Sequence, residues 1–379
     1  MNDPGGGPPA RRPGGRRLAE ARLLFEAERL TLARRLRGLR KNQLAAAVDT
    51  TPTAIGHYES GVHRPSERVL SRLAMSLGVP VEFFQAGHGS VLDAGHAHFR
   101  SLRSTTQIER DQALAYGRIV ADIVAAIEGF VEFPAVMVPE WPVTPDEIAG
   151  PGPVEAARRA RELLVGGPGP VRSVVRLLES AGIVAIVLPP TTERVDAFSV
   201  TAYPRPLVMF NPAKGDYWRN RFDGAHELGH LVMHADAEPG SRVVEDQANR
   251  FAAEFLMPEQ DIADALPATA DWARLAELKT EWGVSMAALL YRARTLRVMK
   301  EVTYRNAMSA MSTRGWRRRE PGPERPLERP TMLTKALEML AVTGVDRDRL
   351  ADAARVTRAD LDLLVPSRPT PSATPTPGR

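Results

Sequence analysis

The sequence predicts a multidomain protein with an all-α domain near its N-terminus, an α+β domain with a small mixed sheet, and a helical C-terminal appendix. The chain has 379 residues, which is enough for two or three domains. Short helical patterns alternate with turn signals over residues 21–84, which is typical of a compact helical unit. Apolar, β-rich runs come later, at 182–189 and on both sides of 204–206, and predict a buried strand and a hairpin or meander.

The composition is that of a globular protein, with 43% hydrophobic and 25% charged residues. The net charge is +4, but residues 1–41 carry eleven Arg and Lys against four Asp and Glu, so a polyanion such as nucleic acid is a candidate partner. The absence of cysteine excludes disulfides, thiol nucleophiles and cysteine zinc sites. The longest apolar stretch, 181–188, is too short to span a bilayer, and residues 1–15 lack the apolar core of a signal peptide. We therefore expect a cytoplasmic protein without a membrane partner.

Proline-, glycine- and charge-rich stretches divide the chain into segments. Apolar residues at helical spacing predict one long helix between residues 104 and 130. The predicted segments are a disordered basic arm at 1–20, the helical domain at 21–86, a linker with the long helix at 87–150, the α+β domain at 151–312, a charged linker at 313–330, a helical segment at 331–365 and a disordered tail at 366–379.

The pattern His226-Glu227-x-x-His230 is typical of metal-dependent hydrolases. Residues four apart share a helix face, so two imidazoles can bind one zinc ion while the glutamate between them lies near a metal-bound water. Glu227 would be the general base that takes a proton from this water and passes it to the leaving amine. Asp223, three residues before His226, is a candidate to orient that ring.

A catalytic zinc site normally has three protein ligands, so a third ligand is expected downstream. Glu245 and Glu254 lie about 2.5 helical turns apart in the next helical segment, so they cannot both reach one ion. We favour Glu245, because Asn249 lies one turn later on the same face and could bond to a ligand histidine. Periodicity alone leaves Glu254 open. We expect one zinc ion per chain, with manganese as an alternative in the cell.

The segment 39–66 resembles the helix-turn-helix of the xenobiotic-response-element (XRE) family, which has a lambda-repressor-like fold. Thr51 suits the cap, and Pro52 the first position, of the second helix, whose start would enter the major groove of double-stranded DNA. Such domains usually bind DNA as dimers, so a homodimer is compatible with the sequence. The resemblance implies contacts to DNA bases and phosphates from Lys41, Thr51, Pro52, Thr53, Gly56, His57 and Arg64.

The sequences HELGHLVMH at 226–234 and EDQANRFAAEFLMP at 245–258 resemble the two-part signature of the ImmA/IrrE-type zinc metallo-endopeptidases, which are gluzincin-like enzymes of zincin-like fold. The similarity runs from about residue 155 to residue 316. It implies that His226, His230 and Glu245 bind zinc and that Glu227 is the catalytic base. It also implies a helix-turn-helix repressor as substrate, which would add as an extended strand to the sheet around 204–206.

These features predict a DNA-binding regulator with zinc-dependent endopeptidase activity that cleaves a helix-turn-helix repressor and so controls stress or mobile-element genes. The alternative is a non-proteolytic transcriptional regulator whose peptidase-like zinc domain is a sensor or a protein-docking module. The presence of Glu227 favours the enzyme, because a degraded site could lose this base at little structural cost.

Overall fold

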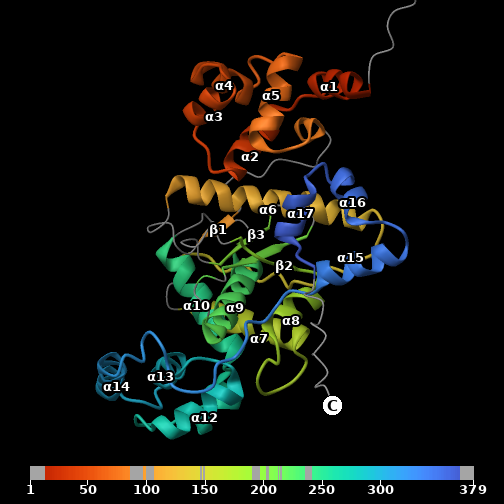
Figure 1. Cartoon of the computed structure of the whole chain (residues 1–379). Helices are drawn as coiled ribbons and strands as arrows, with labels where there is room; N and C mark the ends of the chain where they lie inside the picture. The colour runs from red at the N-terminus through yellow and green to blue at the C-terminus, as the bar shows by residue number, and fades with distance from the viewer. Residues whose placement is uncertain are drawn as a thin grey trace, which may run out of the picture. The chain divides into compact units, whose positions relative to one another are not determined.

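The computed structural model describes residues 13–85, 97–99, 106–145, 147, 150–189, 197–201, 205–211, 213, 216–234 and 241–367. The chain divides into two compact units, and Figure 1 labels most of their helices and strands. One contains residues 1–91, 106–129 and 340–366, and the other contains residues 92–105, 130–339 and 367–379. The helical first unit and the mixed second unit confirm the predicted fold class.

The first unit consists of helices in its described part. Thr51 begins the second helix of the helix-turn-helix, because its hydroxyl accepts a hydrogen bond from the Ala54 amide at 3.1 Å and Pro52 follows it. The predicted apolar seam of Leu44, Ala45, Val48 and Ile55 is buried. The elements are α1 (Pro13–Leu23), α2 (Ala27–Leu36), α3 (Lys41–Ala47), α4 (Pro52–Glu59), α5 (Glu67–Leu77), η1 (Val81–Phe84), α6 (Gln107–Glu128), α16 (Arg347–Ala353) and α17 (Arg358–Leu364).

Helix α1 begins at Pro13, inside the segment 1–20 that we expected to have no fold. Ala21, at its C-terminal end, is fully buried, so the helix is anchored by packing. This helix has few apolar residues, which is why its periodicity is weak in the sequence. Residues 1–12 lie outside the described residues.

Two ion pairs, one buried and one partly buried, join distant parts of the first unit. Arg29 of α2 lies 2.6 Å from the Asp122 carboxylate of α6, and both side chains are almost fully buried. Arg37 donates to both carboxylate oxygens of Asp360 on α17, at 2.8 and 2.9 Å. The helical C-terminal segment predicted from the sequence thus contains α16 and α17, which belong to this unit. A pairing across 323 residues leaves no trace in local periodicity.

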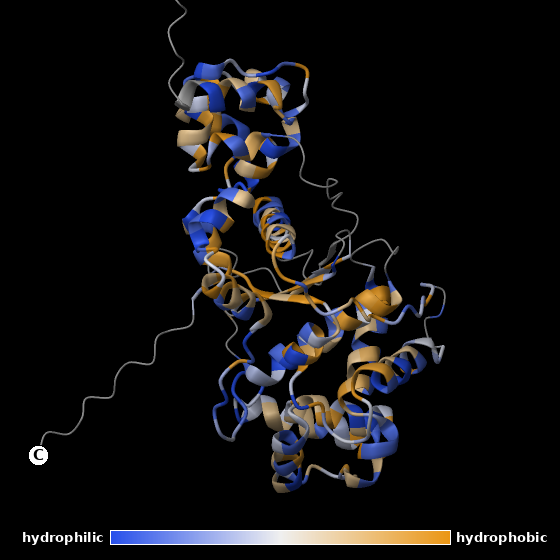
Figure 2. Ribbon diagram, turned by 90° about the vertical axis from the view of Figure 1, so that its right-hand side faces the viewer, coloured by the Kyte–Doolittle hydropathy of each residue, from blue (hydrophilic) through white to orange (hydrophobic). Residues whose placement is uncertain are grey.

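The second unit contains a four-stranded mixed sheet, in the order β1-β3-β4-β2. The strands are β1 (Ala97–Phe99), β2 (Val184–Val187), β3 (Phe198–Val200) and β4 (Leu207–Phe210). Strand β2 is parallel to β4, and β3 is antiparallel to both β4 and β1. The strand expected within 182–189 and the hairpin expected around 204–206 are thus confirmed. Strand β4 is fully buried, and the sheet is hydrophobic in Figure 2.

Helices cover this sheet and extend the core beyond it. Helix α9 packs on β3 and β4, and α10 packs on α9 and α7. Among the described residues, no helix is both long enough and apolar enough to cross a membrane. The helical elements are α7 (Gly152–Leu164), α8 (Val174–Ser180), α9 (Tyr217–Met233), α10 (Arg242–Leu256), α11 (Glu259–Ile262), η5 (Ala263–Ala265), α12 (Trp272–Trp282), α13 (Met286–Thr295), α14 (Glu301–Thr313) and α15 (Met332–Val342), the last of which ends in the first unit.

Residues 313–330, which we predicted to be a charged linker, are bound to the second unit by buried carboxylates. Glu320 accepts hydrogen bonds from the first amides of α13, Met286 and Ala287, at 2.8 and 3.0 Å. Glu328 accepts a hydrogen bond from the Val175 amide at 2.8 Å, and it pairs with Arg221, whose side chain is 1% exposed. The charges of this segment thus have specific partners, which composition alone does not reveal.

We expect Glu328→Ala to destabilise the second unit by about 3–5 kcal/mol, because it leaves the buried Arg221 without a counter-charge. Urea unfolding followed by tryptophan fluorescence measures this loss, since the tryptophans of the chain all lie in this unit, at Trp141, Trp218, Trp272, Trp282 and Trp316.

The matched control is Glu324→Ala in the same segment, because Glu324 and its partner Arg319 are 83% and 82% exposed. Its effect should stay within about 1 kcal/mol, as for other exposed ion pairs. Equal losses in the two variants would show that the buried pair does not stabilise the unit.

Candidate functional site

Helix α9 carries three side chains of the candidate site, those of His226, Glu227 and His230. Its N-terminus is fixed by Asp216, whose carboxylate accepts hydrogen bonds from the amides of Trp218 and Arg219. The exposed fractions of His226, Glu227 and His230 are 0%, 1% and 0%. Buried polar groups require partners, so the contacts of these side chains define what the site can bind.

Glu245 of α10 meets the two histidines of α9. The two Nε2 atoms of His226 and His230 lie 3.0 Å apart. The Glu245 carboxylate oxygens lie 3.2 Å from His226 Nε2 and 3.5 Å from His230 Nε2. One ligand atom from each of the three residues lies within 4.8 Å of the others, an arrangement suited to one metal ion.

Glu254, the alternative third ligand, has other partners. It is almost fully buried, pairs with Arg292, and lies 3.0 Å from Arg158 Nε. Arg292 also donates to the Met257 carbonyl at 2.9 Å. Two guanidinium groups thus balance this carboxylate, and the structure brings Glu245 rather than Glu254 to the histidines.

A chain of hydrogen bonds determines which ring nitrogens of the histidines carry protons. The Gln247 side-chain NH2 donates a hydrogen bond to the Thr144 carbonyl at 2.8 Å, so the Gln247 amide oxygen, 2.9 Å from His234 Nε2, accepts a hydrogen bond from that ring nitrogen. His234 Nδ1 must then accept a hydrogen bond from His230 Nδ1, which lies 3.2 Å away. Burial, together with the neighbouring His230, lowers the pKa of His234 to about 4, so this ring is neutral at physiological pH.

The same reasoning applies to His226, whose Nδ1 lies 3.1 Å from Asn249 Oδ1 and therefore carries the proton. The Nε2 atoms of His226 and His230 consequently face each other as unprotonated lone pairs. Both Glu245 oxygens are buried without a hydrogen-bond donor of good geometry. Three converging electron-pair donors fit a bound cation.

Close approach of α9 and α10 depends on a glycine. A Cβ atom at Gly229 would lie 2.9 Å from Cδ1 of Phe251, a fully buried residue of α10. Only a residue without a side chain fits this crossing as it stands. Gly229 lies between the histidines and thus allows Glu245 to reach them.

Ser199 of β3 is a member of the site that the sequence analysis missed. Its hydroxyl donates a hydrogen bond to Glu227 Oε2 at 2.8 Å, and its side chain is fully buried. The sequence feature that could have indicated this role is a single polar residue within the apolar run 197–200. Asp223, expected to orient His226, lies 3.5 Å from Arg219, and Asn249 faces the His226 Nδ1 atom.

The residues predicted to contact DNA lie around α4. Lys41 Nζ is 3.4 Å from Glu59, and Arg64 donates to the Leu23 carbonyl at 2.8 Å. Beside the cap Thr51, the start of α4 presents a surface to solvent: Thr51, Pro52, Thr53 and His57 are exposed, and Gly56 is partly exposed.

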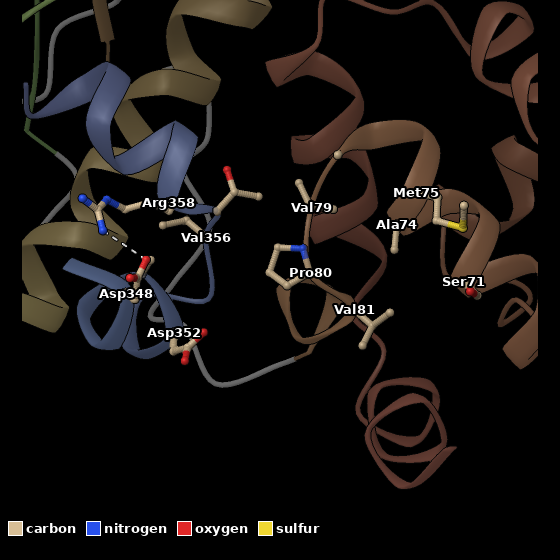
Figure 3. A pocket seen from close by; sticks show the side chains of 13 residues that line it. Ser71, Ala74, Met75, Val79, Pro80, Val81, Asp348, Asp352, Val356 and Arg358 are labelled. Atoms are coloured by element: carbon tan, nitrogen blue, oxygen red, sulfur yellow. Dashed lines mark hydrogen bonds and ion pairs between the residues drawn. The ribbon is translucent and has the colours of Figure 1, made fainter. Parts of the chain in front are cut away.

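The first unit also contains an open cavity of about 650 Å³ (Figure 3). Apolar side chains of α5 and the segment after it, including Met75 and Val79, line one side. Asp348 and Arg358, paired at 3.1 Å, line the other. None of the predicted site residues lines this cavity.

Two parts of the chain match known families. Residues 178–294, which include the histidines and Glu245, match the family described as IrrE N-terminal-like domain. Residues 30–84 match the family described as Helix-turn-helix. The chain therefore joins an XRE-type helix-turn-helix domain to a peptidase-like domain of the ImmA/IrrE type, as the resemblance implied. No match was found among curated proteins.

We expect Asn249→Ala to weaken zinc binding by about 10–100-fold, because the His226 ring loses the partner that fixes its tautomer. Competition of the full chain with a chromophoric zinc chelator measures this affinity. Asn306→Ala, which removes an exposed amide of α14, is the matched control and should bind zinc like the unaltered chain. Equal affinity of all three proteins would mean that Asn249 does not orient a ligand.

Proposed function

We propose that this protein is a DNA-binding regulator whose second unit is a zinc-dependent endopeptidase. The observation that carries the proposal is the convergence of two unprotonated imidazole nitrogens and a buried carboxylate beside Glu227. A cytoplasmic location and the absence of a membrane partner belong to the same proposal.

His226, His230 and Glu245 would hold one zinc ion per chain, with manganese as an alternative in the cell. Bound zinc would lower the pKa of a water molecule and polarise the peptide carbonyl. Glu227 would take a proton from the attacking water and deliver it to the leaving amine as the carbon–nitrogen bond breaks. Ser199 donates a hydrogen bond to one oxygen of Glu227 at 2.8 Å, which would fix the orientation of this carboxylate.

The exposed start of α4 would enter the major groove, with Thr53 and His57 near base edges. Lys41 and Arg64 would contact phosphates. We propose a helix-turn-helix repressor as the protein substrate, whose cleavage would induce stress or mobile-element genes. A homodimer would match a two-fold symmetric operator.

We expect Glu227→Gln to reduce peptide hydrolysis by at least about 10²-fold, because the amide cannot accept the proton of the attacking water. Comparing new protein N-termini by mass spectrometry in cells with either form, with and without DNA damage, identifies the substrate as well. Zinc and DNA binding should be unchanged, since Glu227 is not one of the three converging ligands.

Glu245→Gln is the complementary variant, because it should lose zinc as well as hydrolysis. If N-termini are identical with and without Glu227 while target transcription still depends on the protein, the peptidase-like domain is a sensor or a docking module, and the proposed hydrolysis is wrong.

We expect Lys41→Ala to weaken binding to any DNA duplex and to reduce the salt dependence of the affinity by about one counterion, because Lys41 would neutralise one phosphate. Fluorescence anisotropy at several salt concentrations measures both effects. The control is Lys300→Ala, an exposed lysine of the other unit, which should leave the salt dependence unchanged. The phosphate contact is excluded if the two variants behave alike.

A further inference from the structure

A short strand from another part of the chain covers one edge of the sheet in the second unit. This strand, β1, precedes α6 in the sequence, whereas β3 and β4 follow long after α6 (Figure 1). It runs antiparallel to β3, with Ala97 opposite Val200, His98 opposite Ser199 and Phe99 opposite Phe198. Because of this pairing, β3 is an interior strand rather than an edge strand.

The covered edge belongs to the strand that contacts the candidate base. Ser199 donates its hydrogen bond to Glu227, so β3 passes directly beside the group that would activate water. The register places His98 opposite Ser199. The backbone of β1 therefore runs along the strand of the sheet that is bonded to Glu227.

An endopeptidase must hold its substrate as an extended chain, and the open edge of a strand offers backbone hydrogen bonds for this purpose. The other edge of β3 is paired with β4, and β2 pairs with the far edge of β4. An extended peptide can therefore pair with β3 only at the position that β1 fills.

We propose that Ala97–Phe99 is the chain's own occupant of the position where an extended substrate binds, so that linker and substrate compete for β3. This inference rests on the proposed endopeptidase function and specifies how its site is regulated. The β1–β3 pairing covers only three residues, so it is a weak contact held by tethering at both ends. The β3–β4 pairing does not include β1, so the rest of the sheet can persist when β1 leaves.

The test measures binding of a fluorescein-labelled peptide with the sequence of residues 94–103 to the full chain carrying Glu227→Gln. Anisotropy is compared between this parent and the same protein with His98→Pro and Phe99→Pro. Neighbouring residues of an edge strand alternate in the direction of their amides, so one of the two prolines removes an amide that faces β3. We expect the apparent Kd to fall by about tenfold or more, because an edge that is occupied in most molecules binds a free peptide in proportion to its open fraction.

The matched control carries Ala94→Pro and Gly95→Pro, which lie in the same linker before β1, and its Kd should equal that of the parent. A second variant leaves β1 intact and lengthens its tether by ten Gly and Ser residues after Arg100. Its Kd should fall by about threefold, because a longer tether lowers the effective concentration of β1. This variant keeps the test decisive if the proline variant does not fold.

Equal Kd values in all four proteins, or no peptide binding to any of them, would overturn the proposal and leave β1 as a structural fourth strand. Because the assay uses Glu227→Gln and needs no hydrolysis, its outcome is independent of the cleavage experiment. If the proline variant binds the peptide more tightly but no protein cleavage depends on Glu227, the endopeptidase function alone is refuted.

Discussion

Three electron-pair donors that converge without a proton between them are the constraint on which the candidate site depends. Two imidazole nitrogens 3.0 Å apart and a buried carboxylate repel one another unless a cation lies between them. The surroundings maintain this arrangement. Asn249 and the series His234, Gln247 and Thr144 hold the ring protons on the far sides of the ligand imidazoles. The packing of the domain thus directs the Nε2 lone pairs of His226 and His230 and the Glu245 carboxylate toward one point.

The spacing of the histidines was readable from the sequence, because four residues in a helix return to the same face whatever the surroundings. The choice between Glu245 and Glu254 was not settled by that rule. In the structure, Arg158 and Arg292 balance the charge of Glu254. The close crossing at Gly229 then brings Glu245 to the histidines.

Contacts between distant residues account for the other differences from the sequence-based expectations. Ser199 meets Glu227 only because β3 packs on α9, and Asp360 meets Arg37 across most of the chain. Glu320 and Glu328 stand in a segment whose composition is typical of a solvated linker, yet they cap helices of the second unit. Short-range periodicity predicts helices and strands, but it carries no information on such partners. Helix α1 was missed for a related reason, because its anchor is the burial of one small alanine.

We propose that His226, His230 and Glu245 together bind one zinc ion. X-ray absorption spectroscopy of the zinc-loaded full chain tests it most directly, because imidazole rings give a characteristic scattering pattern. We expect a four-coordinate ion with two imidazole nitrogens at about 2.0–2.1 Å and oxygen atoms as the remaining ligands. A spectrum with fewer than two imidazoles, or one that is unchanged by His230→Ala, would contradict it.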